Sequence, residues 1–84
     1  MISVLNGPET PGYAAGKVTI LNDAGYAGTS AANADANWTN TTSTVFYEDP
    51  KMEATAKDIA SKLGIDTVRQ QTGLGDPDVV IVLR

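Results

Sequence analysis

The chain has 84 residues, which is enough for one small domain and too few for two. Its net charge of −4 and its six dispersed Lys and Arg residues argue against nucleic-acid binding, which needs clustered cations. Cysteine and histidine are absent, so the sequence excludes disulfides, thiolate metal sites and a Ser-His-Asp triad. No run approaches the roughly 18–20 apolar residues of a membrane span. We therefore expect no cofactor, no metal and no direct membrane insertion by this segment.

The first half of the chain predicts a strand, a helix and a second strand. Residues 2–5 form a short apolar run that ends at the breaker Asn6-Gly7-Pro8. Apolar residues at helical spacing predict a helix over residues 10–25. Gly16 inside this helix predicts close packing, because glycine costs about 1 kcal/mol relative to alanine in a helix. The weakly patterned stretch 26–32 is interpreted as a strand.

The second half contains the clearest helical pattern. An apolar stripe from Met52 to Leu63 predicts a helix that begins at Asp49-Pro50 and ends at Gly64. An apolar run without alternation predicts a strand over 79–83 that is buried on both faces or central in the sheet. The remaining segments are a polar loop over 33–44, a β-branched and aromatic strand over 44–47, a short extended piece over 65–69 and a loop over 70–77.

The element order is β-α-β-β-α-β, with an optional short strand before the last. Two amphipathic helices can cover one face of such a sheet, which predicts an α/β (α+β) fold built as a two-layer sandwich. The favoured arrangement is ferredoxin-like, with a four-stranded sheet whose first and last strands lie centrally. An open parallel sheet is the competing topology.

Several short motifs occur in an order that resembles the C-terminal domain of LytR-type proteins. The resemblance covers nearly all of residues 1–84, as a single domain. The motifs are Val4-Leu5-Asn6-Gly7, Gly12-Tyr13-Ala14, Ala24-Gly25-Tyr26, Asn33-Ala34-Asp35 with Trp38, Thr44-Val45 with Tyr47, Ile59-Ala60 with Leu63-Gly64, and Asp78 to Leu83.

The resemblance implies an extracytoplasmic domain of bacterial cell-envelope proteins, in a longer protein that is membrane-anchored. In that family the domain often follows a LytR-CpsA-Psr transferase domain, whose catalytic motifs have no counterpart here. The chain departs from the family pattern at Pro8 and Pro11 in a normally glycine-rich turn, and at Arg84, where glycine is common.

Trp38 is the most informative candidate for ligand binding. It lies in a polar stretch with Asn37 and Asn40, and an indole flanked by amides is typical of sugar-binding surfaces. The alternative is that Trp38 folds back as a hydrophobic pin for the loop. Both interpretations stay open.

The turn Asn6-Gly7 precedes a helix N-terminus and could bind an anion through exposed N–H groups. It lacks the spacing of nucleotide-binding loops, so we favour a structural turn in which Asn6 bonds backbone groups and Gly7 takes a positive φ. The acids Glu48, Asp49 and Glu53 could hold a divalent cation. We favour the other interpretation, a helix cap with charges that complement the helix dipole, because it explains all three residues.

We therefore predict a non-catalytic accessory domain that binds peptidoglycan or a wall glycopolymer through Trp38, Asn37 and Asn40, with Asn6 and Gly7 as further contacts. The alternative is a protein–protein interaction or dimerisation module that positions a LytR-CpsA-Psr transferase domain, with another envelope protein as its partner. Its natural docking edge would be an unpaired strand within 26–32 or 44–47.

Overall fold

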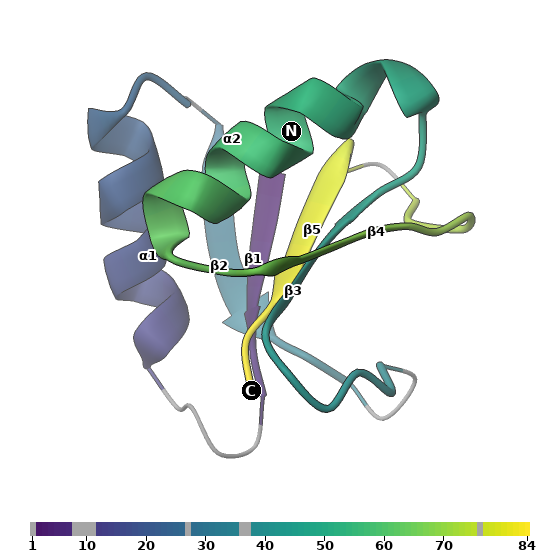
Figure 1. Cartoon of the computed structure of the whole chain (residues 1–84). Helices are drawn as coiled ribbons and strands as arrows, with labels where there is room; N and C mark the ends of the chain where they lie inside the picture. Colours follow the sequence, from purple (N-terminus) through teal and green to yellow (C-terminus); the bar gives the residue numbers. More distant parts are fainter. Residues whose placement is uncertain (1, 8–11, 27, 36–37, 76) are drawn as a thin grey trace.

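A computed structural model describes residues 2–7, 12–26, 28–35, 38–75 and 77–84. Figure 1 shows the helices packed beside a single sheet. Its strands are β1 (Ile2–Asn6), β2 (Thr29–Asn33), β3 (Thr44–Tyr47), β4 (Thr67–Gln70) and β5 (Val79–Val82), and its helices are α1 (Tyr13–Asp23), η1 (Pro50–Met52, one 3-10 turn) and α2 (Glu53–Leu63).

The sheet is mixed, with the strand order β2-β1-β5-β3-β4. The pairs β1–β2, β1–β5 and β3–β4 are parallel, and β3–β5 is antiparallel. Each helix thus connects two parallel strands that are direct neighbours, and the last strand along the chain fills the place between the two βαβ units. The predicted sandwich class and the central β5 with β1 beside it are confirmed. The ferredoxin-like order is not observed, because neither βαβ unit is split and the optional strand adds a fifth member.

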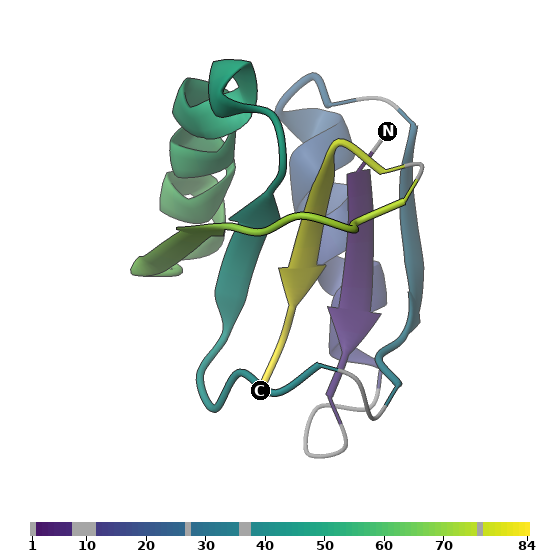
Figure 2. The same ribbon diagram turned by 90° about the vertical axis from the view of Figure 1, so that its right-hand side faces the viewer.

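Both helices cover the same face of the sheet, as the sequence predicts (Figure 2). Alternate residues of the strands point toward the helices, since side chains of a strand alternate between faces. One continuous core results, and its largest fully buried side chains are Leu21, Ile59, Ile81, Val4, Val45 and Val79.

The opposite face is covered by loops instead of helices. Figure 2 shows the segment between β4 and β5 crossing this face of the sheet. A second cluster lies beneath the loops and contains buried Phe46, Leu74, Val80 and Val82, with Trp38 packed against it. Because β5 carries side chains into both clusters, its four residues are all buried.

The sequence signals for α2 are confirmed in detail. The Asp49 side chain accepts a hydrogen bond from the Lys51 backbone N–H at 3.0 Å and caps the 3-10 turn that leads into the helix. Gly64 ends α2 with a left-handed φ of 71°, a conformation that glycine adopts without strain.

Two predictions from the sequence are wrong. Gly16 is exposed, and a Cβ added there would meet nothing within 4 Å, so no close packing explains it. Residues 44–47 do not form an edge, because β3 lies between β5 and β4. Of the two docking edges that the sequence predicts, the one within residues 26–32 lies at an edge of the sheet, because it overlaps β2. The helix predicted over residues 10–25 begins at Tyr13, and residues 8–11 lie outside the described residues.

Candidate functional site

The candidate site lies at the end of the sheet where β1 and β5 finish and β3 begins. Arg84 organises it. Its Nε donates to the Asn40 carbonyl at 2.8 Å, and one of its Nη atoms donates to the Trp38 carbonyl at 2.6 Å. Its backbone N–H donates to the Ser43 hydroxyl at 3.0 Å. One side chain therefore fixes the loop that carries the predicted ligand-binding residues.

Asn6 has a structural role on the α1 side of this end. Its Oδ1 accepts a hydrogen bond from the Ala14 backbone N–H at 2.7 Å, so it caps the first turn of α1 from the end of β1. Its Nδ2 donates to Oδ1 of Asn33, its register partner on β2, at 3.2 Å. The prediction that Asn6 bonds a backbone group is confirmed.

Gly7 is required for a different reason from the predicted one. Positive φ values occur at six of the described glycines, and Gly7 is not among them. A Cβ at Gly7 would instead lie 2.3 Å from the Leu83 carbonyl oxygen and 3.1 Å from Cδ of Arg84. Gly7 is glycine because the backbone of Leu83, directly after β5, and the Arg84 side chain come too close for any side chain there.

The Trp38 ring packs as the hydrophobic pin that the sequence left open as an alternative. Its centroid lies 5.2 Å from that of Phe46, with a tilt of 42° between the planes. The residue is half-buried, so part of its surface still faces solvent.

Asn40 is also used within the loop. Its Nδ2 donates to the Thr42 carbonyl at 2.7 Å and to the Val82 carbonyl at 3.3 Å. Its Oδ1 is buried and has no hydrogen-bond partner in the part of the chain that the structure describes. Asn37 lies outside the described residues.

The predicted residues that the structure describes lie near one another, but around a residue that the prediction omitted. Gly7, Trp38 and Asn40 all approach Arg84, and Asn6 precedes Gly7 directly. The only signal in the sequence was that arginine stands where the family commonly has glycine. No local sequence pattern indicated that the Arg84 guanidinium would bond carbonyl groups of a loop more than 40 residues earlier in the chain.

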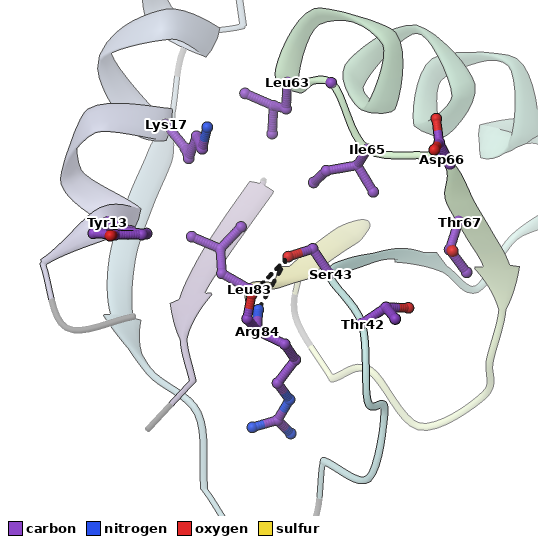
Figure 3. A pocket seen from close by; sticks show the side chains of 11 residues that line it. Tyr13, Lys17, Thr42, Ser43, Leu63, Ile65, Asp66, Thr67, Leu83 and Arg84 are labelled. Carbon is purple, nitrogen blue, oxygen red and sulfur yellow. Dashed lines mark hydrogen bonds between the residues drawn. The ribbon is translucent and has the colours of Figure 1, made fainter. Parts of the chain in front are cut away.

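A pocket of about 400 Å³ opens at the same end of the sheet, between α1 and the segment that joins α2 to β4. Figure 3 shows Tyr13 and Lys17 on its α1 side, Leu63 and Ile65 above, and Ser43, Thr42 and Thr67 across from them. The full lining is Tyr13, Lys17, Thr42, Ser43, Leu63, Gly64, Ile65, Asp66, Thr67, Leu83 and Arg84.

The pocket carries both signs of charge and several hydroxyl groups. Lys17 makes no hydrogen bond or ion pair with any residue in the described ranges, and Asp66 lies on the opposite wall. Such a lining can bind a polar ligand through hydrogen bonds. The chain has no histidine and no cysteine, so the pocket cannot hold a Ser-His or a Cys-His pair.

The acids considered for metal binding have other partners. The Glu48 carboxylate accepts the Leu74 backbone N–H at 3.1 Å, and Asp49 caps Lys51. Glu53 accepts from the Tyr47 hydroxyl at 3.0 Å, and this hydrogen bond holds the pKa of Glu53 below its ordinary value. Among the described residues no group of three or more acids is placed to hold a metal ion.

These features define a small two-layer α+β domain with a polar pocket at one end of its sheet. Over residues 1–84 the sequence matches the family described as LytR cell envelope-related transcriptional attenuator, and the chain belongs to that family. It is a family of small accessory domains of the cell envelope. The resemblance noted in the sequence is thereby confirmed.

One solved structure supports this assignment at the level of the fold and the sequence. The chain is similar to the solution structure of the C-terminal domain of RV0431, with a TM-score of 0.69 and 29% identity over 98% of this chain and 69% of that one. A comparison with curated proteins finds no match. Within the described residues no helix has the length and apolar character that crossing a membrane requires.

Proposed function

We propose that this is a non-catalytic, extracytoplasmic accessory domain that binds peptidoglycan or a wall glycopolymer, as part of a membrane-anchored envelope protein. The observation that carries the proposal is the polar pocket beside Arg84. Its volume suits one or two sugar units, since small-molecule sites span about 300–1,000 Å³.

The lining has the chemistry that carbohydrates need. Tyr13 is 60% exposed at the mouth of the pocket and offers an aromatic face against which the apolar face of a sugar ring can pack. Hydroxyl groups of Ser43 and Thr67 can bond sugar hydroxyls. Lys17, which has no described partner, can bind a carboxylate of a peptide stem or a phosphate of a glycopolymer.

The residues predicted from the sequence take supporting parts in this proposal. Asn6, Gly7 and Asn40 hold the end of the sheet and the loop in place around Arg84. The half-exposed Trp38 remains a second contact surface, on the face of the sheet opposite the helices. A polymer longer than the pocket could reach it.

The test is a titration of isotope-labelled protein with purified muropeptides and with wall glycopolymer, followed through backbone amide shifts. We expect shifts at Tyr13, Lys17 and Ser43. No shift with either ligand at millimolar concentration would overturn the proposal.

Substitutions then separate the two contact surfaces. Tyr13→Ala should weaken binding at least about tenfold with little loss of stability, because its ring is mostly exposed. Trp38→Ala should lower the melting temperature, and it weakens binding only if the ligand extends beyond the pocket. Lys17→Ala should reduce affinity for anionic ligands, whereas Lys57→Ala on α2, which pairs with Glu53 away from the pocket, is the matched control.

A further inference from the structure

The outer edge of β2 carries backbone groups that no described residue satisfies. β2 is the terminal strand of the sheet and pairs with β1 on one side only. The Ala34 N–H donates to the Asn6 carbonyl at 2.8 Å, and this bond identifies which residues along the strand direct their backbone groups toward β1. In this parallel ladder residues 30, 32 and 34 direct their backbone groups toward β1, so Thr29, Ala31 and Asn33 direct theirs outward.

This edge lacks the features that usually prevent edge-to-edge pairing. Natural edge strands are blocked by charged residues, prolines, bulges or short length. β2 has five residues, Thr-Ser-Ala-Ala-Asn, with no charge and no proline, and four of the five are exposed. Their small side chains leave the backbone accessible.

The other edge of the sheet differs in these respects. β4 has four residues and includes the charged Arg69. The Gln71 N–H donates to the Tyr47 carbonyl, so only Val68 and Gln70 of β4 direct backbone groups outward. The contrast between the edges singles out β2 as the open one.

We propose that β2 pairs with β2 of a second copy of this chain, antiparallel about a two-fold axis at Ala31. In that register Ala31 lies opposite its own copy, and Thr29 lies opposite Asn33. All three outward-facing residues then meet outward-facing partners as hydrogen-bonded pairs, two bonds to each pair. The two sheets join into one continuous sheet.

Net charge does not favour a second copy, but the contact strand itself is uncharged. Each chain carries a net charge of −4, so two copies repel at long range. The strand that forms the contact has no charged residue, so no like charges meet across it. Since a five-residue edge buries less than the roughly 1,200 Å² of a stable interface, the dimer is weak and reversible. We expect a dissociation constant on the order of 10⁻⁴ M.

Amide hydrogen exchange gives a signature that other modes of association lack. As the protein concentration rises from about 10 μM to 1 mM, the amides of Thr29, Ala31 and Asn33 should become protected. Those of residues 30 and 32 are already bonded to β1 and should not change. Protection of the outward amides only, together with a rising mass in sedimentation, is the expected result.

Ala31→Pro is the decisive variant. It removes the central outward donor and leaves the bonds to β1 in place, so the fold is retained. The dissociation constant should rise at least tenfold. Ala31→Lys should act in the same direction by placing two ammonium groups across the axis, whereas Ala54→Lys on the exposed face of α2 is the matched control.

A chain that remains monomeric at 1 mM, or a dimer that Ala31→Pro leaves intact, would overturn the proposal. If the chain remains monomeric, the occupant that remains to be considered for the β2 edge is an extended strand of a different protein. Neither result bears on the pocket, because Tyr13 and β2 contribute to separate surfaces.

Discussion

Replacing Gly7 by alanine should destabilise the domain strongly although it adds a single methyl group. The new Cβ would lie 2.3 Å from the Leu83 carbonyl oxygen. That oxygen belongs to backbone, and the same residue's N–H donates to the Leu5 carbonyl at 2.9 Å. No side-chain rotation can relieve the overlap, so β1 and the end of β5 must move apart.

The magnitude follows from these contacts. Overpacking of a well-packed site costs about 1–3 kcal/mol, and loss of the hydrogen bond between Leu83 and Leu5 adds about 1 kcal/mol. The free energy of unfolding should therefore fall by roughly 2–4 kcal/mol. In a domain of this size each kcal/mol lowers the melting temperature by about 4–8 °C, so a decrease of at least about 8 °C is expected.

Thermal and urea denaturation followed by circular dichroism measure this effect, with Gly16→Ala as the internal control. A Cβ at Gly16 meets nothing within 4 Å on the exposed surface of α1, so this variant should gain about 1 kcal/mol through helix propensity. The same chemical change thus has opposite signs at two sites. If Gly7→Ala were neutral, or if both variants shifted stability in the same direction, the explanation for Gly7 would be refuted.

Three further predictions concern hydrogen bonds. Asn6→Ala should cost about 1 kcal/mol of unfolding free energy because the Ala14 N–H loses its cap, and denaturation would show it; an unchanged midpoint would contradict the capping role. Arg84→Lys should shift the backbone amides of the loop over 38–43, since one ammonium cannot replace the fork that bonds two carbonyls; unchanged loop spectra would argue against it. The Tyr26 hydroxyl donates to Asp58, which lowers the pKa of Asp58 and raises that of Tyr26. This contribution to stability is complete between the ordinary pKa values of about 4 and 10, falls as pH drops through the folded pKa of Asp58, and falls as pH rises through that of Tyr26. Tyr26→Phe should weaken both dependences, and carboxyl titration by NMR should show the pKa of Asp58 rising in this variant.

The local elements could be predicted from the sequence because their signals are local. The apolar stripe and Gly64 define α2, and the unbroken apolar run defines β5. The strand order could not be predicted in the same way. Placing β5 between the two βαβ units depends on pairings between residues more than 30 positions apart, such as Val45 with Ile81, and periodicity carries no information about them.

The candidate site was predicted in part for a similar reason. Trp38 and Asn40 stood out by composition and lie at the same end of the sheet as the pocket, but no residue predicted from the sequence is among those that line it. Arg84 was missed because its role depends on carbonyl groups of the 38–43 loop, which only the folded chain brings near. Gly7 was assigned the wrong cause, since a glycine needed for positive φ and one needed for close approach look identical in a sequence.

The position of β5 has a consequence for how the domain is made. A ribosome delivers the chain from its N-terminus, and domains fold as their segments emerge. Both βαβ units are complete before Val79 is synthesised. At that point β1 and β3 each keep an unpaired edge, and β5 is the strand that pairs with both. The two βαβ units must wait for β5, so the folding step that joins them follows the synthesis of residues 79–82. Loss of the last six residues should therefore leave two separate units without a shared core.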